Sequence, residues 1–272
     1  MATRTAAGSR GSRGAAPRPH APLAAYVLHR YDWSESSLIL DLFTREQGRV
    51  AVAAKGAKRP YSQLRSVLLP FQRINASLGK AAAHDEGASD VQTLRGAEWA
   101  GGAAMLTGAA LFSGFYLNEL LMKLLARHDP HPTLFDIYAQ TLPALGAAED
   151  RQVQAALRAF ELSLLREVGV LPDLSLVTLT QQPLDGDRHY ALRADAGVAT
   201  ATGADGEMGG ELRGEVLVGL QAALEHGSLE ALRQACGRSL GELRVALRGL
   251  VHYHLGSSVL RTREVMRDLQ SL

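Results

Sequence analysis

The chain has 272 residues, of which 46% are hydrophobic and 21% charged, a composition that allows two modest domains with sizeable cores. Its 29 Lys and Arg against 28 Asp and Glu give a net charge of +1, so the totals neither favour nor exclude a polyanionic partner. The only cysteine, Cys236, excludes an intrachain disulfide and a cysteine-rich zinc ribbon, and it fits a reducing, cytoplasmic compartment. No apolar run approaches the roughly 18–20 residues that a membrane span needs.

Residues 1–22 form a basic N-terminal tail that we expect to be disordered. The tail contains four arginines and no acidic residue, and it is rich in Ala, Gly, Ser and Pro. Because no apolar stretch follows the charges, we do not expect a secretory signal peptide. Two interpretations stay open, a salt-sensitive attachment to DNA and a solvated extension without a role.

Residues 23–98 predict a small β-barrel. Short runs with an apolar period near two are separated by turn-forming residues, and Leu38, Leu40 and Leu42 share one face of such a run. Five short strands with varied connections favour a closed or partly open barrel of the OB-fold type. The expected strands are Tyr26–Arg30, Ser37–Phe43, Arg49–Ala54, Phe71–Leu78 and Val91–Arg95.

Residues 99–272 predict a mainly α-helical domain, so the expected fold class is α+β. Residues 171–210 lose the helical period and predict a β insertion, in which Leu174–Thr180 and His189–Arg193 form a hairpin and 194–210 a Gly-rich loop. The helix beginning at Ser228 contains a potential break near Gly237. The expected helices are Met105–Arg127, Thr133–Leu145, Arg151–Val168, Glu215–His226, Ser228–Leu255 and Arg261–Ser271.

Positive charge is concentrated in the barrel segment of this nearly neutral chain. Between Arg30 and Lys80 there are nine basic and four acidic residues. A phosphate backbone is a dense line of negative charge, and Gly56 within Lys55–Arg59 allows close backbone approach. The alternative is a solvated basic surface without a ligand. The basic residues expected to contact DNA are Arg30, Arg45, Arg49, Lys55, Lys58, Arg59, Arg65 and Arg73.

Two aromatic residues, Tyr31 and Trp33, lie beside Arg30 at the first loop of the expected barrel. If exposed, such rings stack on unpaired bases, as in many single-strand binders. The other interpretation is that either ring fills the mouth of the barrel. We include Trp33 among the expected DNA contacts and leave Tyr31 open.

The helix ending at Arg127 combines a wide apolar surface with cations at its end. This combination suits a short acidic and hydrophobic peptide tail, although most of its leucines must also serve the core. Arg151 and Arg158 lie seven residues apart on one helical face. Farther along, Arg244 and Arg248 form either a second DNA surface or an exposed face that pairs with Glu242. The residues expected to bind a peptide tail are Leu120, Lys123, Leu124, Arg127, Arg151 and Arg158.

No pattern in the chain predicts an enzyme, a metal or a cofactor. His252 and His254 are two residues apart and therefore point to different faces of a helix, which is unsuitable for a shared metal. HExxH and Walker-type motifs are absent from the sequence. Cys236 has no histidine-and-acid context and is expected to be a small core residue.

Taken in order, several of these segments resemble the RecO family of DNA repair and recombination mediators. The likeness is close from Ala24 to Gly169 and looser elsewhere, and the order and spacing of the segments make it specific. The matching segments are Tyr26–Arg30, Ser34–Leu38, Leu42–Glu46, Gly48–Val50, Ala54–Pro60, Phe115–Glu119, Asp129–Pro132 with Leu134-Phe135, and Arg158–Leu162.

The resemblance implies an OB-fold and a helical domain that bind single- and double-stranded DNA and anneal complementary strands. It also implies contact with the acidic tail of the single-stranded-DNA-binding protein SSB and partnership with RecR, which together load RecA in the RecF pathway of the bacterial cytoplasm and nucleoid. No membrane or small-molecule substrate is implied. Some family members carry a four-cysteine zinc site after the third helix. Residues 171–210 contain no cysteine, so other interactions must hold this insertion.

Two rival functions remain open at this stage. One is a protein–protein scaffold whose OB-fold does not bind DNA directly. The other is a nuclease or another DNA enzyme that acts with a divalent ion.

Overall fold

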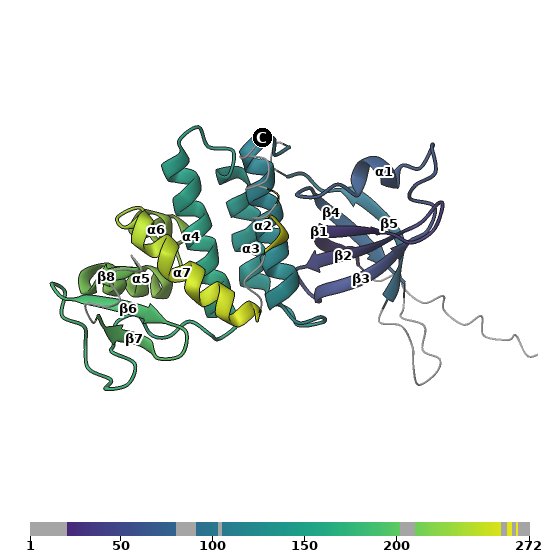
Figure 1. Cartoon of the computed structure of the whole chain (residues 1–272). Coiled ribbons are helices and arrows are strands. Elements are labelled where there is room, and N and C mark those ends of the chain that lie inside the picture. Colours follow the sequence, from purple (N-terminus) through teal and green to yellow (C-terminus); the bar gives the residue numbers. More distant parts are fainter. Residues whose placement is uncertain are drawn as a thin grey trace, which may run out of the picture.

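The computed structural model describes residues 21–79, 91–102, 105–201, 210–256, 260–262 and 265. It is elongated, with a β-barrel at one end, helices in the middle and a small β-sheet at the other end (Figure 1). The expected α+β class, with a barrel followed by helices and a small sheet, is confirmed. The expected tail disorder and most of the helix Arg261–Ser271 fall outside the described residues. Within the described ranges, no helix is both long and apolar enough to cross a bilayer.

The first domain is a closed five-stranded barrel. Its strands are β1 Leu23–Asp32, β2 Leu38–Thr44, β3 Gly48–Ala54, β4 Arg73–Leu78 and β5 Val91–Trp99. They follow one another in the order β1-β2-β3-β5-β4, β1 pairs with β4 to close the barrel, and β3 pairs with β5 in parallel. The short helix α1, Leu64–Val67, connects β3 to β4. This arrangement is that of an OB-fold, and the strands agree with the expected ones apart from their ends.

Both faces of β2 and of the middle of β1, residues 25–28, are buried. Val27 and Leu40 point into the barrel, whereas Tyr26 and Phe43 belong to a second core that the barrel shares with the helices. Alternation along a strand places neighbouring residues on opposite faces. The barrel therefore buries one outer face against the helical domain instead of exposing it to water.

The helices form a compact bundle next to the barrel (Figure 1). The expected break near Gly237 is confirmed, because it separates the sixth helix from the seventh. Helix α2 (Gly108–Leu124) ends earlier than the expected end at Arg127, and Leu125 has an extended conformation. The bounds are α2 Gly108–Leu124, α3 Pro132–Ala144, α4 Asp150–Glu167, α5 Gly214–His226, α6 Leu229–Cys236 and α7 Leu240–Leu255.

The β insertion differs from the expected hairpin. β6 His189–Arg193 pairs with β7 Gly197–Thr200 and β8 Glu211–Arg213, so Leu174–Thr180 is not its partner strand and that expectation was wrong. Gly197, with φ +68°, allows the tight β6–β7 turn.

Hydrogen bonds hold residues 171–184 against this sheet. Thr178 N donates to Val198 O at 2.9 Å, and Thr178 Oγ1 accepts from Val198 N at 2.8 Å. The Tyr190 hydroxyl likewise accepts from the backbone N–H of Asp185 at 2.9 Å. Backbone and hydroxyl contacts thus connect the segments of an insertion that contains no cysteine.

An aromatic cluster joins the barrel to the helices. The Tyr26 ring lies 5.3 Å from Phe135 and 5.0 Å from Tyr138, and Phe43 lies 5.4 Å from Phe135, measured between ring centroids. Tilted and edge-to-face aromatic contacts at these distances add to the stabilisation that burial alone gives. The cluster therefore fixes the position of β1 and β2 on α3.

A buried polar relay runs through the same interface. The Tyr138 hydroxyl donates to Asn118 Oδ1 at 2.5 Å, and Asn118 Nδ2 donates to the carbonyl of Leu28 at 2.9 Å. The β1–β2 register shifts between Val27 and His29, so Leu28 has no partner on β2. The amide of α2 thereby satisfies a strand carbonyl, and burial raises the pKa of Tyr138 well above its usual value.

The β2–β3 turn touches the α2–α3 connection at Gly48. Gly48 has φ +66°, and a Cβ atom at this position would lie 2.0 Å from the carbonyl oxygen of Asp129. Next to it, the backbone N–H of His128 donates to the carbonyl of Arg49 at 2.9 Å. Only glycine combines this conformation with such a close approach.

We predict that Gly48→Ala lowers the free energy of unfolding by about 2 kcal/mol or more, because it adds left-handed strain to a backbone clash. Urea unfolding measures this change. Gly219→Ala is the matched control, since Gly219 lies within α5 and its added Cβ meets nothing within 4 Å. That control should be neutral or stabilising by up to about 1 kcal/mol. Equal effects of the two substitutions would contradict the close approach at Gly48.

Candidate nucleic-acid interface

The loops expected to contact DNA lie at the end of the barrel that faces away from the helices (Figure 1). The β1–β2 loop and the segment after β3 are tied together, since Lys58 N donates to Ser36 O at 3.0 Å and Gly56 N to Ser37 Oγ at 3.4 Å. Gly56 has φ +72°, which permits the turn between Lys55 and Lys58. The two loops therefore form one surface.

A cleft of about 520 Å³ opens in this surface, between the β1–β2 loop and α1. We call it the barrel cleft. Arg30 lies on its wall, with Nη1 donating to the carbonyl of Leu68 at 3.4 Å. The polar residues that line the barrel cleft are Arg30, Asp32, Glu35, Lys58 and Arg65.

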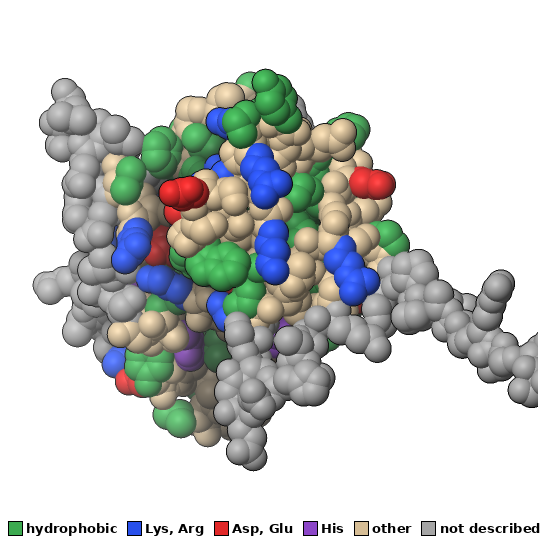
Figure 2. All heavy atoms as spheres, turned by 90° about the vertical axis from the view of Figure 1, so that its right-hand side faces the viewer, with side chains coloured by type: hydrophobic (Ala, Val, Ile, Leu, Met, Phe, Trp, Pro, Cys, Tyr) green, Lys and Arg blue, Asp and Glu red, His purple; other side chains and the backbone are tan. Residues whose placement is uncertain are grey.

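Several cations around the barrel cleft face solvent. Arg30, Lys55, Arg59 and Arg65 are exposed. Among the residues the structure describes, Lys55, Arg59 and Arg65 make no ion pair, whereas Lys58 pairs with Asp32 at 3.1 Å. Figure 2, which looks onto this end of the molecule, shows basic side chains spread over the face with fewer acidic ones among them.

The two aromatic residues of the first loop do not fill the barrel. Trp33 is 57% exposed, and Tyr31 is 42% exposed with its ring 4.4 Å from that of His29. The interior of the barrel is filled by small and aliphatic side chains instead. The interpretation that either ring plugs the barrel mouth is therefore wrong.

Arg45 does not belong to this surface, contrary to expectation. Its Nε and Nη2 donate to the two carboxylate oxygens of Asp136 on α3, at 3.0 and 2.9 Å. This bidentate hydrogen bond lowers the pKa of Asp136 below its usual value, and the pKa of Arg45 is raised. The Arg45 charge connects the barrel to the helical domain.

Arg49 is also engaged within the molecule, and its predicted contact with DNA is not supported. Its Nη1 donates to the carbonyls of Met122 and Leu125 at the end of α2, the latter at 2.9 Å. Its Nε lies 3.4 Å from buried Asp41, an ion contact without hydrogen-bond geometry. With only 11% of its side chain exposed, Arg49 caps a helix C-terminus, where a cation is favourable.

Arg73 lies apart from the barrel cleft. It is exposed at the start of β4, and its charge acts on Tyr26 and Asp136, which belong to the interface with the helices. The nine expected DNA contacts thus divide between the two ends of the barrel. Arg30, Trp33, Lys55, Lys58, Arg59 and Arg65 gather at the free end.

The residues expected to bind a peptide tail do not form one site. Near the barrel, Lys123 lies 3.3 Å from Glu119 and Arg127 lies 3.7 Å from Asp41. Leu124 is partly buried and packs against the core. These three residues remain accessible only in part, beside the domain junction.

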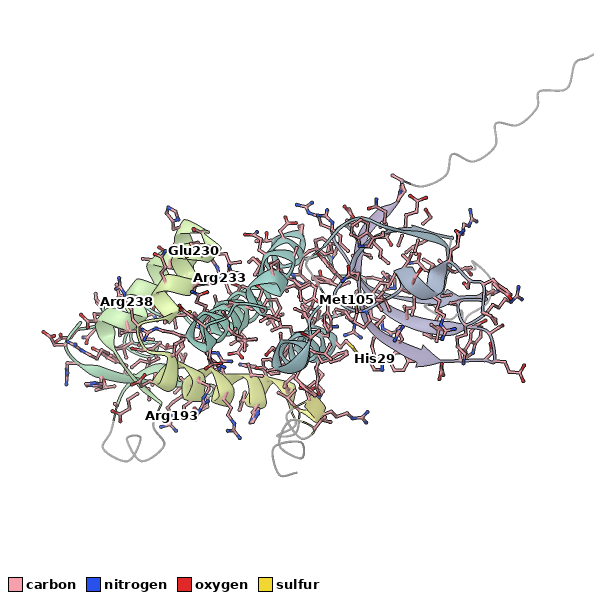
Figure 3. The ribbon with its side chains drawn as sticks, turned by 90° about the horizontal axis from the view of Figure 1, so that it is seen from above. His29, Met105, Arg193, Glu230, Arg233 and Arg238 are labelled. Atoms are coloured by element: carbon pink, nitrogen blue, oxygen red, sulfur yellow. The ribbon has the colours of Figure 1, made fainter. Side chains whose placement is uncertain are left out.

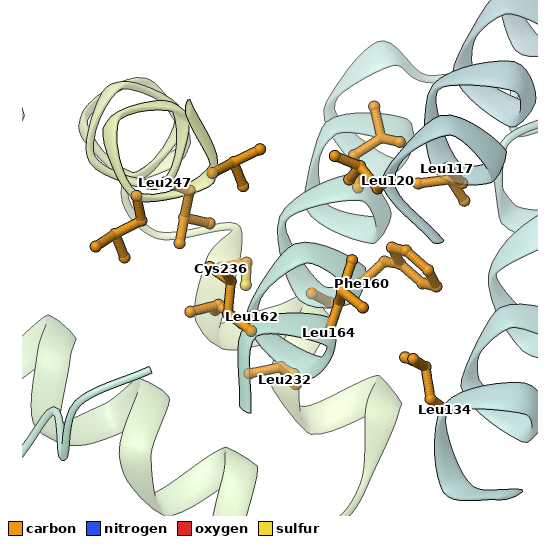
Figure 4. Packing of buried hydrophobic residues seen from close by; sticks show 14 of the residues in the cluster. Leu117, Leu120, Leu134, Phe160, Leu162, Leu164, Leu232, Cys236 and Leu247 are labelled. Atoms are coloured by element: carbon orange, nitrogen blue, oxygen red, sulfur yellow. The ribbon is translucent and has the colours of Figure 1, made fainter. Parts of the chain in front are cut away.

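Two of the expected peptide contacts are buried, so this part of the prediction was wrong. Leu120 is fully buried in the helical core (Figure 4). Arg158 is 4% exposed, and its Nη2 donates to Glu161 Oε1 at 2.8 Å. The same oxygen accepts from the Tyr116 hydroxyl at 2.6 Å. This ion pair is part of the core and is not available to a partner.

Arg151 lines a second cleft, of about 540 Å³, between the start of α4, the end of α3 and α6. We call it the arginine cleft. Arg233 and Arg238 lie beside it, on the side of the molecule remote from the barrel (Figure 3). Arg151 and Arg233 donate to the carbonyls of Gly237 and Gln140, at 2.6 and 2.7 Å. Burial lowers the pKa of Arg233.

The arginine cleft was not evident from sequence. Arg233 and Arg238 are more than 80 positions from Arg151 and meet it only because the chain breaks at Gly237 between α6 and α7. In the sequence, the expected helix break near Gly237 was the only feature that pointed to this arrangement. Three guanidinium groups around a concave, partly apolar surface favour an anionic ligand.

No catalytic constellation emerges among the described residues, where no three His, Cys, Asp or Glu side chains gather as metal ligands. Cys236 is buried, and burial raises the pKa of its thiol to about 12. A thiol in this state is a poor nucleophile.

Two family models match the chain in succession. Residues 22–100 match Recombination protein O N terminal, and residues 105–264 match Recombination protein O C terminal. The chain belongs to the RecO family. The resemblance seen in the sequence is thereby confirmed.

Curated relatives named DNA repair protein RecO span nearly the whole chain. The relatives from Polaromonas sp. (strain JS666 / ATCC BAA-500) and Variovorax paradoxus (strain S110) are each 50% identical, over 250 and 257 residues. The relative from Delftia acidovorans (strain DSM 14801 / SPH-1) is 49% identical over 259 residues. Each match covers 91% of this chain and 96% of the RecO relative.

The pairing of Arg45 with Asp136 predicts an acid-dependent loss of stability in this RecO chain. A carboxyl group with a lowered folded-state pKa stabilises above its unfolded pKa, about 3.9 for Asp, and loses that contribution as pH falls through the folded pKa. Asp136→Asn should therefore be less stable than the parent near neutral pH, and the difference should shrink below about pH 4. Thermal unfolding between pH 3 and 7 tests this.

Glu46→Gln is the control for Asp136→Asn. Glu46 lies next to Arg45 in the β2–β3 turn, so this variant removes a nearby carboxylate and keeps the Arg45–Asp136 pair. Its stability relative to the parent should change less over the same pH range. Parallel curves for the parent and Asp136→Asn at all pH values would contradict this interpretation of the pair.

Proposed function

We propose that this chain is a DNA repair and recombination mediator that binds single- and double-stranded DNA and anneals complementary strands. Together with RecR and SSB it promotes the loading of RecA in the RecF pathway, at the nucleoid of the bacterial cytoplasm. The observation that carries the DNA-binding part is the group of exposed cations at the free end of the barrel, three of which make no ion pair with any residue in the described ranges. The partners and the pathway are those that the RecO resemblance implies.

Annealing by such a protein needs no catalytic group. Two strands repel each other through their phosphates, and a protein that neutralises phosphates on both strands, leaving base edges free, lowers this barrier. Lys55, Arg59 and Arg65 hold one strand at the barrel. The exposed face of α7 around Arg244 and Arg248 provides a second basic surface for the other strand.

We expect Lys55→Ala combined with Arg59→Ala to weaken DNA binding for all sequences alike. The magnitude of the slope of log K against log salt should fall by roughly 1.4–1.8, because each of the two lost phosphate contacts removes about 0.7–0.9 from it. Arg45→Ala is the matched control, since it removes the same charge from the same domain but at the helix interface. Affinity titrations at several salt concentrations test this, and an unchanged slope in the double variant would remove Lys55 and Arg59 from the binding surface.

An annealing assay with and without magnesium separates the rival functions. The proposal requires retention of DNA and faster pairing of complementary strands without chemical change. A scaffold that binds proteins alone would retain no DNA at moderate salt. A DNA enzyme would form a cleaved or otherwise altered product when the divalent ion is added. Either result would contradict the proposed function.

For the acidic SSB tail we propose the arginine cleft. Arg151, one of the residues first expected to bind the tail, lines this cleft. Arg233 and Arg238 add positive charge there, and alanines of α3 and α4 add an apolar surface. An acidic peptide that ends in an apolar residue and a free carboxylate matches these features. Lys123 and Arg127 pair with acidic side chains at the domain junction, at 3.3 and 3.7 Å. Within the arginine cleft, Glu230 lies 4.0 Å from Arg233, so Arg151 and Arg238 are the cations we assign to the peptide carboxylates.

Peptide titration distinguishes the two candidate sites for the tail, the arginine cleft and the domain junction. With a peptide copying the SSB tail, Arg238→Glu and Arg151→Glu should each weaken binding about tenfold or more, because each replaces a cation by an anion at the ligand. Arg127→Glu, a charge reversal of the same kind at the domain junction, should leave affinity unchanged. The opposite pattern would move the tail site to the junction.

A further inference from the structure

Tyr61 is the most exposed large hydrophobic side chain of the described residues, at 100%. It lies in a tight turn in which the backbone N–H of Ser62 donates to the carbonyl of Arg59 at 3.0 Å. Pro60 precedes it and restricts the backbone at the second turn position. Since the turn is formed by backbone groups and proline, the ring is presented to solvent on a stiff support and contributes no packing.

Trp33 is the corresponding ring on the adjacent loop, with 57% of its surface exposed. Its backbone N–H donates to Ser37 O at 3.4 Å, so the β1–β2 loop closes on itself behind the ring. The hydrogen bond from Lys58 N to Ser36 O connects this loop to the segment that leads to Tyr61. Both rings therefore belong to loops that border the barrel cleft.

The cations of these two loops and of the barrel cleft suit a nucleic-acid backbone. Arg30, Lys58 and Arg65 line the barrel cleft, and Arg59 is exposed two positions before Tyr61. Cations alone attract single- and double-stranded DNA alike, since both present phosphates. Aromatic faces act differently, because they stack on bases only where the bases are unpaired and accessible.

We propose that Tyr61 and Trp33 form an aromatic clamp that stacks on unpaired bases and gives the barrel a preference for single-stranded over double-stranded DNA. This inference rests on the proposed DNA-binding function and adds the basis of strand selection. The cations set the affinity for any phosphate backbone. The two rings add affinity only for a strand whose bases are free.

Two other exposed rings of the described residues lie away from the barrel cleft. Trp99 is 64% exposed, and its indole N–H donates to Gln72 Oε1 at 3.2 Å. Tyr253 is 62% exposed on α7, with its ring 5.3 Å from that of His254. Each of these rings has a partner outside the barrel cleft. Tyr253 follows Arg244 by nine positions, which places it on the opposite side of α7 from that arginine. It therefore provides a matched control for the loss of an exposed tyrosine.

The test compares Tyr61→Ala, Trp33→Ala and Tyr253→Ala in the full-length chain, with an oligothymidylate and a duplex of equal length at one salt concentration. Tyr61→Ala and Trp33→Ala should each lower single-strand affinity by roughly 5- to 150-fold, the range for loss of one stacked base. Duplex affinity and the salt slope should stay at the parent values, because no cation is removed. Tyr61→Phe should restore single-strand binding, and Tyr253→Ala should have no effect.

Fluorescence provides a second readout. Trp33 and Trp99 are the only tryptophans, so Trp99→Phe leaves Trp33 as the sole indole. Oligothymidylate should quench its emission through stacking, and the duplex should leave it unchanged. Equal quenching by both ligands would overturn the clamp.

The outcomes also separate the clamp from DNA binding itself. If the parent chain binds neither ligand, the proposed function fails. If Lys55→Ala with Arg59→Ala weakens binding while Tyr61→Ala and Trp33→Ala bind single strands like the parent, the proposed function stands and the clamp is overturned. Equal losses on single strand and duplex in the aromatic variants would likewise overturn strand selection by the rings.

Discussion

The barrel is attached to the helices by the burial of one face of β1 and β2. Tyr26 and Phe43 enter a core with Phe135 and Tyr138, and the relay through Asn118 satisfies the strand carbonyl at the irregular point of β1. Removing a single buried aromatic ring of this kind typically costs about 3–5 kcal/mol. This attachment directs one end of the barrel toward the helices and leaves the other end, with its loops, free to face a ligand.

The attachment also explains why the cationic residues divide into two groups. Residues near the β2–β3 turn serve the interface, as Arg45 does with Asp136 and Arg49 with the end of α2. The sequence showed a surplus of positive charge, but Asp136, which binds Arg45, lies 91 positions away along the chain, and the α2 carbonyls that Arg49 contacts lie 73 and 76 positions away. Charge counting within one segment cannot detect such partners, whereas the turn residues around Gly56 correctly indicated an exposed basic loop.

Local periodicity predicted the elements well and the exposure of single positions less well. Strand alternation and the change to a helical period located the barrel and the bundle. Arg151 and Arg158 lie on one face of α4 as expected, yet Arg151 is exposed and Arg158 buried. The helix packs against α3, α6 and α7, and the residues from Ala155 to Leu165 are all buried. Arg151 is accessible because it lies in the first turn, before this buried stretch begins. The prediction of a hairpin between Leu174–Thr180 and His189–Arg193 was wrong for a related reason. The short strand β6 pairs with β7, which lies in the Gly-rich stretch after it, because Gly197 allows a tight turn between the two strands.

The shared core has a practical consequence for dissecting the molecule. A fragment that ends near residue 100 would retain all five strands but expose Tyr26, Leu28, Phe43 and Phe71 to water as one contiguous apolar patch. Patches of this kind promote self-association. Weak or anomalous DNA binding by such a truncated barrel would then reflect the missing helical domain rather than the properties of the barrel loops. The barrel and the helical domain should therefore be studied together, as one cooperative unit.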